Sequence, residues 1–440
     1  MKDQSLPFRT NLIWAITGNV IYAVCQWGML LLIAKLSTAT AMGLFALGLA
    51  ISSPIIMMAG LGLRSVQATD AAGEFSFSSY WKLRLSGLLL AFVAMALVCL
   101  VAGYGRTASG VVMLIGSAKC TEALSDIVFG KFQQKERMDL VARSMMIKGI
   151  ASLGFFAVIL TLSSSLLLAI GGWLAVWAAV LLLYDIPHVV ALIKDEGPTG
   201  LSGWGRTLFG ASIDLPVHAK LAKISMPLGM VVGLSALVPS IPRYIIEHRL
   251  GVEQLGFFAA LAYLTTPGNV VVSAIGYAAS PRLAVHFNAR EAEKYRHLLI
   301  RVVILGICIG LLQFAAFGIG GGALLALLLN DQFKAGLPLL YVLLLVAILS
   351  YAFGLLGVGI TAARQFKIQL YIGVGLSIMT LVLAVILVPL WGLYGAALSI
   401  AGGTVVASLA YGFILNRSLS RARLADQLKF EETPLLDRGI

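Results

Sequence analysis

Charged side chains are scarce in this chain. Only 12% of its 440 residues are Asp, Glu, Lys or Arg, whereas soluble proteins carry roughly 25%. Hydrophobic residues make up 59% of the sequence. A soluble chain of this length would form two or three domains, but this composition predicts an integral membrane protein instead.

Groups that mark metal centres, disulfides and catalytic sites are also rare or missing. The four cysteines all fall in apolar runs, and none has the spacing of metal ligands, so neither a disulfide nor a metal site is predicted. The sequence has no Walker phosphate-binding motif and no long polar loop that could hold catalytic carboxylates. We therefore expect no enzymatic activity and no cofactor.

Long apolar runs dominate the sequence. A helix needs about 20 apolar residues to cross a bilayer, and we predict twelve such spans, so the predicted fold is all-α and integral to the membrane. The spans are 11–34, 42–63, 83–104, 108–129, 145–164, 166–189, 224–246, 255–277, 298–319, 336–361, 368–389 and 392–415.

Lysine and arginine are distributed unevenly between the two sides of these spans. With both termini in the cytoplasm, 26 of the 32 basic residues lie on the cytoplasmic side. The periplasmic side has five, and one, Lys119, lies within a span. This asymmetry follows the positive-inside rule. The net charge of +12 is thus mainly a topology signal, and its spread over short segments argues against nucleic-acid binding.

The chain contains an internal repeat. "GLFALGLAISSP" (Gly43 to Pro54) returns 213 residues later as "GFFAALAYLTTP" (Gly256 to Pro267). Six spans precede the centre and six follow it, which predicts two parallel, pseudo-symmetric bundles with a cleft between them. The predicted domains are a first bundle (1–192), a cytoplasmic linker (193–223), a second bundle (224–415) and a cytoplasmic tail (416–440). The linker segment Gly203 to Leu215 fits either an amphipathic helix or an irregular connection.

The fourth predicted span carries three charged side chains. Lys119, Glu122 and Asp126 fall within an arc of about 60° on one helix face. Each charge costs about 2.5–3.5 kcal/mol at the centre of a bilayer, so this face is predicted to line a hydrated cavity. Lys119 and Glu122 are three residues apart and can pair. A buried pair that only fixes helix packing is the alternative, and a proton-carrying or cation-binding role for Glu122 or Asp126 stays open.

Three arginines are further candidates for the substrate site. Arg243 follows two prolines in the seventh span, and its planar guanidinium suits phosphate or carboxylate groups. Arg64 and Arg84, at cytoplasmic ends of spans, fit either an anionic headgroup or the topology bias. Prolines that kink spans are candidate hinges: Pro54, Pro239, Pro242 and Pro267.

Three segments resemble a known family of membrane transporters. They are Ile241 to Phe287, Val388 to Gly403 ("VPLWGLYGAALSIAGG") and Phe129 to Gly149 ("FGKFQQKERMDLVARSMMIKG"). All three are similar to the polysaccharide flippases of the multidrug/oligosaccharidyl-lipid/polysaccharide (MOP) exporter superfamily. The resemblance covers most of the chain and rests mainly on Gly, Pro and apolar positions. "LLNDQF" (Leu328 to Phe333) departs from it, because relatives tend to have a glycine near Asn330.

The resemblance implies that two six-helix bundles move a lipid-linked oligosaccharide from the cytoplasmic to the periplasmic leaflet of the inner membrane. The implied partners are that lipid, membrane lipid, and a polysaccharide polymerase with its chain-length machinery. A proton or sodium ion as coupling ion stays open. The alternatives are a cation-coupled multidrug antiporter of the same superfamily and, less favoured, a membrane glycosyltransferase or polymerase.

Overall fold

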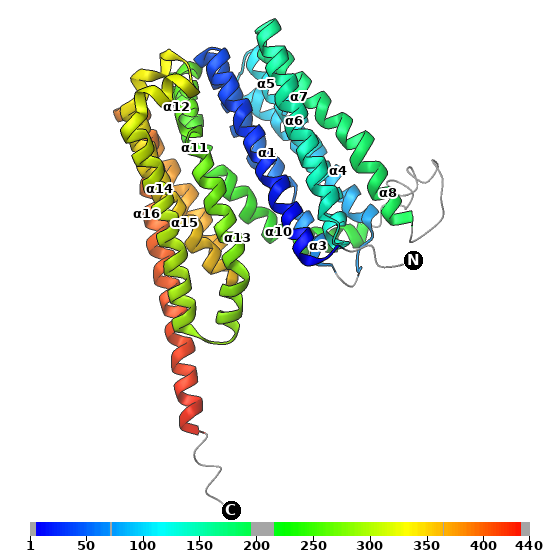
Figure 1. Ribbon diagram of the computed structural model, residues 1–440, viewed down its shortest axis with the longest axis vertical. Coiled ribbons are helices and arrows are strands. Elements are labelled where there is room, and N and C mark those ends of the chain that lie inside the picture. Colours follow the sequence, from blue (N-terminus) through cyan, green and yellow to red (C-terminus); the bar gives the residue numbers. More distant parts are fainter. Residues whose placement is uncertain (1–5, 71–72, 195–214, 364, 433–440) are drawn as a thin grey trace, which may run out of the picture. The chain divides into compact units, whose positions relative to one another are not determined.

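The computed structural model describes residues 6–70, 73–194, 215–363 and 365–432, and every regular element in them is a helix (Figure 1). The helices, in chain order, are α1 (Phe8–Leu36), α2 (Ala39–Ala59), α3 (Leu63–Thr69), α4 (Phe77–Val101), α5 (Arg106–Gln134), α6 (Met138–Ser163), α7 (Leu166–Val180), the π-helical turn η1 (Leu181–Asp185), α8 (Ile186–Lys194), α10 (Leu215–Leu237), α11 (Ile241–Leu250), α12 (Val252–Tyr263), α13 (Thr266–Asn288), α14 (Ala292–Leu328), the 3₁₀ turn η2 (Asp331–Gly336), α15 (Leu337–Ala362) and α16 (Phe366–Glu432). Most of the predicted linker, 195–214, lies outside the described residues.

Ten helical stretches among these residues are long and apolar enough to cross a membrane. The protein is a multi-pass membrane protein, and the all-α prediction is confirmed. The predicted twelve spans differ from the ten stretches in two places. The charged helix α5 is not among the ten, and Lys367–Leu415 is one stretch that contains the two last predicted spans. Gly392 inside that stretch has a non-helical backbone, φ 57° and ψ −132°. The count of twelve stays a prediction.

The helices pack into two compact units. The first comprises Met1–Tyr263 with Leu328–Asp331, and the second comprises Leu264–Leu327 with Gln332–Ile440. The first unit therefore contains α10, α11 and α12 as well as α1 to α8. The predicted bundles, 1–192 and 224–415, follow the sequence repeat and divide the chain elsewhere, so they and the cleft between them stay predictions.

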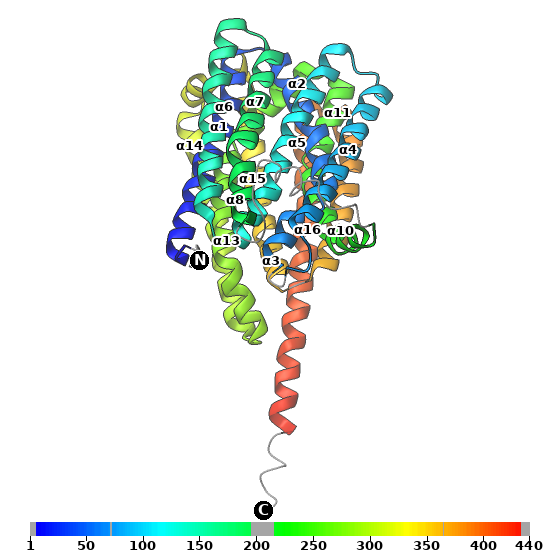
Figure 2. The ribbon, with the colours of Figure 1, turned by 90° about the vertical axis from the view of Figure 1, so that its right-hand side faces the viewer.

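The first unit is organised around α5. Helices α2, α4, α6 and α7 all contact it, and α1 runs beside α6 in both views (Figures 1 and 2). Large apolar side chains from α4, α8 and the C-terminal half of α5 form a buried cluster. Its members Trp81, Phe132 and Val189 are at most 3% exposed. This packing fixes the backbone of α5, so its polar residues sit on a rigid support.

Helices α2 and α12, which carry the two copies of the repeat, cross at equivalent glycines. A Cβ atom on Gly43 would lie 1.9 Å from the carbonyl oxygen of Val252, and one on Gly256 would lie 1.7 Å from that of Ala39. Only glycine allows two helix backbones to approach so closely. The 213-residue repeat thus coincides with a close backbone contact within the first unit.

The candidate hinge prolines lie at different kinds of position. Pro239 lies in the turn between α10 and α11, and Pro242 and Pro267 lie in the first turns of α11 and α13. A proline fits there because the first turn has no partner for its missing N–H. Pro54, by contrast, lies inside α2 without ending it. Whether any of these positions acts as a hinge stays a prediction.

In the second unit, two side chains bond to the chain just before α13. The side-chain amide of Gln313 donates to the carbonyl of Leu264 over 2.8 Å, and the Tyr351 hydroxyl donates to that of Thr265 over 2.6 Å. These carbonyls lie in the break between α12 and α13. The two hydrogen bonds therefore satisfy carbonyl oxygens that would be costly to leave unpaired in the membrane.

Candidate functional site

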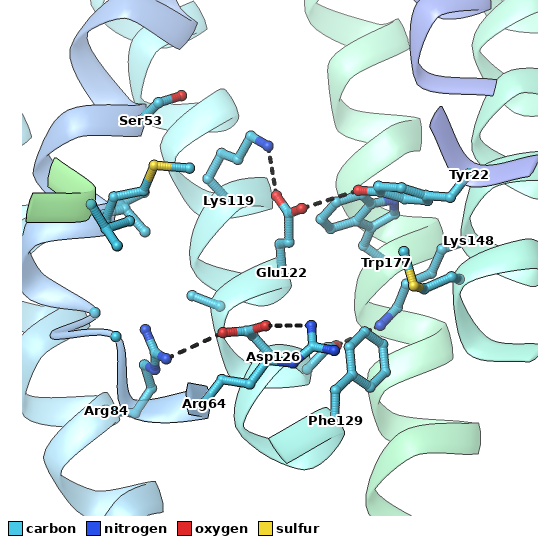
Figure 3. Close-up of a pocket in the computed structure, with 18 residues that line it drawn as sticks. Tyr22, Ser53, Arg64, Arg84, Lys119, Glu122, Asp126, Phe129, Lys148 and Trp177 are labelled. Atoms are coloured by element: carbon cyan, nitrogen blue, oxygen red, sulfur yellow. Dashed lines mark hydrogen bonds and ion pairs between the residues drawn. The ribbon is translucent and has the colours of Figure 1, made fainter. Parts of the chain in front are cut away.

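The charged face of α5 lines a pocket within the first unit (Figure 3). The cavity volume is about 280 Å³. Lys119, Glu122 and Asp126 all point into it, as do Arg64 and Arg84. The other lining residues are Tyr22, Ser53, Ile56, Met57, Gly60, Gly62, Ala123, Ser125, Phe129, Met145, Lys148, Trp177 and Val232. The structure therefore brings five of the six candidate substrate-binding residues together.

Lys119 and Glu122 form an ion pair at one end of the pocket. The Lys119 ammonium lies 2.6 Å from a Glu122 oxygen, and the other Glu122 oxygen accepts a hydrogen bond of 3.1 Å from Tyr22. The side chains are 24% and 36% exposed, so the pair is open to the cavity. The Lys119 ammonium also lies 6.0 Å from the centre of the Trp177 ring. The two charges neutralise each other here.

At the other end, one carboxylate contacts two guanidinium groups. Asp126 accepts from Arg64 over 3.0 Å with one oxygen and from Arg84 over 3.5 Å with the other. We call these three residues the arginine fork. The Arg84 side chain is 5% exposed, whereas those of Arg64 and Asp126 are 30% and 35% exposed. Gly60 leaves room for this arrangement, because a Cβ there would lie 2.3 Å from a nitrogen of Arg84.

Lys148 is a pocket residue that the sequence analysis missed. The count of basic residues places it on the cytoplasmic side. Its position inside the predicted span 145–164 is the sequence feature that could have indicated a buried lysine. Its ammonium lies 2.6 Å from Asp185 and 2.5 Å from the Ser125 hydroxyl. The Lys148 and Asp185 side chains are 3% and 0% exposed, and the second Asp185 oxygen has no hydrogen-bond partner.

Asp185 owes its position to an irregular turn. It is the last residue of the π-helical turn η1, and Pro187 follows two residues later. Proline has no N–H to donate to the preceding turn, so the regular α-helical hydrogen-bond pattern cannot continue through it. π-Helical turns occur frequently at functional sites. Here the turn directs a carboxylate inward, onto Lys148.

Arg243 does not line this pocket. Its guanidinium lies over the Tyr263 ring, 5.2 Å from the ring centre, and donates to the Tyr263 hydroxyl over 3.4 Å. It lies in the first turn of α11, directly after Pro242, and belongs to the same unit as the pocket. Its predicted contact with substrate therefore has no support from the geometry of the pocket.

The pocket carries a positive excess. Four cations line it (Arg64, Arg84, Lys119 and Lys148), but only two carboxylates do (Glu122 and Asp126). Lys119 is paired with Glu122, and Lys148 is paired with Asp185 behind the pocket wall. The unmatched charge therefore lies at the arginine fork, where two cations share one carboxylate. Among the described residues, no group of three or more His, Cys, Asp and Glu is arranged to hold a metal ion.

The chain is similar to the capsular polysaccharide biosynthesis protein CapF from Staphylococcus aureus. The two are 26% identical over 409 residues, which is 92% of this chain and 99% of the relative. No protein-family profile matches the chain. The similarity therefore extends over almost the full length of both proteins.

Solved structures of MOP transporters show the same fold. An inward-facing multidrug resistance MATE transporter of the MOP superfamily covers 93% of this chain and 99% of its own, with a TM-score of 0.69 and 15% identity. The lipid II flippase MurJ in an inward closed conformation covers 98% of this chain and 94% of its own, with a TM-score of 0.69 and 12% identity. The chain thus has the fold of MOP-superfamily transporters, as the resemblance of its three segments implied.

A third solved structure with this fold is described by the polarity of its binding pocket. A MOP transporter from Pyrococcus furiosus, described as having a binding pocket of reverse polarity that suggests a different function, covers 93% of this chain and 95% of its own. Its TM-score is 0.62 and its identity is 15%. In one solved protein of this fold, the reversed polarity of the binding pocket is thus described as suggesting a different function.

Proposed function

We propose that the protein flips a lipid-linked oligosaccharide of the polyprenyl-diphosphate type from the cytoplasmic to the periplasmic leaflet. The single observation that supports this most directly is the positive excess at the arginine fork, inside a membrane-spanning unit. Guanidinium groups bind phosphate oxygens through paired, charge-assisted hydrogen bonds. The name of the CapF relative places that protein in capsular polysaccharide biosynthesis, and MurJ is named as a flippase of lipid II.

The physics of the substrate fits a hydrated, charged pocket. Each sugar hydroxyl costs several kcal/mol if it is buried in hydrocarbon without a hydrogen-bond partner. A polar pocket supplies partners while the polyprenyl tail stays in the lipid. A diphosphate that moves outward across an inside-negative membrane gains about 2.3 kcal/mol per charge per 100 mV. The proposed transport is by alternating access, without catalysis and without a cofactor, and a coupling proton or sodium ion stays open.

The proposed setting follows the sequence analysis. The protein lies in the inner membrane with both termini in the cytoplasm, as the lysine and arginine asymmetry favours. Its partners are the lipid-linked oligosaccharide, membrane lipid, and the polymerase and chain-length machinery that would use the flipped product. Arg243 and the candidate hinges Pro54, Pro239, Pro242 and Pro267 remain part of the proposal, as an exit contact and as bending points.

The proposal is tested with purified protein in liposomes. The probe is polyprenyl-diphosphate N-acetylglucosamine with a nitrobenzoxadiazole label on the sugar, and dithionite bleaches only the label in the outer leaflet. We expect the wild type to expose the whole probe pool within minutes, whereas protein-free liposomes protect about half of it. Replacing Arg64 and Arg84 together by glutamine is expected to slow flipping at least about tenfold, because two charge-assisted contacts are lost.

Arg249→Gln is the matched control, since this exposed arginine at the end of α11 lies outside the pocket. Its rate should equal that of the wild type. If the double variant flips the probe at the wild-type rate, the pocket is not the path. The MATE fold supports one second candidate, cation-coupled drug export. Efflux of ethidium without flipping of the lipid probe would favour that candidate over the proposal.

A further inference from the structure

The arginine fork holds a carboxylate where a phosphate would bind. The two Asp126 oxygens point to different guanidinium groups, one to Arg64 and one to Arg84 (Figure 3). The other carboxylate that lines the pocket, Glu122, contacts one cation and one tyrosine instead. Arginine binds carboxylate and phosphate oxygens through the same kind of charge-assisted hydrogen bond, so two guanidinium groups that hold a carboxylate can also hold a phosphate.

We infer that Asp126 is an internal surrogate for the diphosphate, which occupies the fork until the substrate displaces it. This inference rests on the proposed function, because it assigns to the same pocket a residue that competes with the substrate. Asp126 then determines specificity. Only a ligand with anionic oxygens replaces it on both arginines, and a neutral or cationic ligand leaves the fork closed.

Burial explains why the fork needs such a surrogate. Arg84 is 5% exposed, and its Nε has no hydrogen-bond partner, so Asp126 supplies the opposite charge that compensates this buried guanidinium. A buried guanidinium without an opposite charge is strongly destabilising. Asp126 satisfies it before substrate binds. A diphosphate brings more negative charge and more acceptor oxygens than one carboxylate, so it can take over both arginines.

Exposure explains how Asp126 can leave. Its side chain is 35% exposed and faces the cavity, so a change of rotamer carries the carboxylate into the hydrated space. Arg64 is 30% exposed and retains a weak contact of 3.4 Å with Gln133. The buried arginine is therefore the fixed half of the fork, and Arg64 with Asp126 forms the movable half.

The inference predicts that removing the Asp126 charge tightens anion binding while it slows transport. For the full-length Asp126→Asn protein in detergent, we expect calorimetry with pyrophosphate to give a dissociation constant about tenfold below that of the wild type. In the liposome assay the same variant should show a lower KM and a lower maximal rate, because nothing competes the diphosphate off the arginines.

Glu122→Gln is the matched control, because it removes the same charge from the same pocket but frees only Lys119. Its dissociation constant for pyrophosphate should fall less than about threefold. If both variants tighten binding equally, the effect is general electrostatics and the surrogate role is wrong. Weaker or unchanged binding by Asp126→Asn also overturns it. A gain in melting temperature with pyrophosphate that is larger for Asp126→Asn than for the wild type supports the role even where the variant is less stable.

Farnesyl diphosphate distinguishes a lipid headgroup from a free phosphate compound. We expect it to bind more tightly than pyrophosphate, and to show the same tightening in Asp126→Asn. Equal affinity for the two probes would overturn the lipid source. The binding results are independent of flipping. A wild type that flips the sugar probe, with an Asp126→Asn protein that does not bind anions more tightly, refutes the surrogate and leaves the proposed function standing.

Discussion

Replacing Lys148 by methionine is expected to lower the free energy of unfolding by about 3–5 kcal/mol, because it leaves the Asp185 carboxylate buried without a cation. The ammonium that is lost lies 2.6 Å from Asp185, and neither side chain is more than 3% exposed. Unfolding of the purified protein in mixed micelles with increasing dodecyl sulfate measures the loss.

Lys119→Met is the control for this variant. It removes the same side chain from the same pocket, but its partner Glu122 is 36% exposed and can be hydrated. We expect a loss of less than about 1 kcal/mol, as for other exposed ion pairs. Equal losses for Lys119→Met and Lys148→Met would contradict the special status of the buried pair.

A double variant separates the missing charge from the missing packing. Lys148→Met combined with Asp185→Leu removes both charges and leaves apolar groups in their place. Such replacements of buried pairs are often neutral or stabilising, so most of the loss in Lys148→Met should be recovered. If the double variant is as unstable as the single one, the loss comes from packing around Ser125 rather than from an unpaired carboxylate.

The sequence predicted the local geometry of the site but not its long-range contacts. Residues on one helix obey a fixed rotation per residue, so Lys119, Glu122 and Asp126 could be placed on one face without coordinates. The partners of Asp126 could not be identified in this way. Arg64 and Arg84 precede it by 62 and 42 residues and come from other helices, and their position at cytoplasmic span ends is equally explained by the topology bias.

Lys148 was missed for the same physical reason. A basic residue near the cytoplasmic end of a span ordinarily extends to the membrane surface, so its type and position do not reveal burial. Burial here depends on Asp185, which an irregular turn directs inward from another helix. The membrane helices could be predicted more easily than these ion pairs, because long apolar runs predict membrane helices wherever they occur.

The second large effect on stability is expected at the glycine contact between α2 and α12, which carry the two copies of the sequence repeat. Gly256→Ala is expected to lower the free energy of unfolding by about 3 kcal/mol or more, because overpacking against rigid backbone cannot be relieved by a side-chain rotation. The added Cβ would lie 1.7 Å from the Ala39 carbonyl oxygen and 2.7 Å from the Gly43 nitrogen. Helices α2 and α12 would have to move apart. The same dodecyl sulfate titration measures the effect.

Gly154→Ala in α6 is the matched control. A Cβ at Gly154 meets no atom within 4 Å, so only the intrinsic helix preference changes. Alanine is favoured over glycine in a helix by about 1 kcal/mol, and this variant should therefore be as stable as the wild type or more so. A similar loss in both variants would mean that the crossing is not the cause.

The repeat also predicts how two such substitutions combine. Gly43 and Gly256 face the same crossing from opposite helices, and either added methyl group forces the same separation. Once Gly256→Ala has moved the helices apart, Gly43→Ala meets less resistance, so the double variant should lose clearly less than the two single losses added together. Additive losses would show that each glycine is constrained independently. The contact between α2 and α12 would then not explain why both copies of the repeat have a glycine at this position.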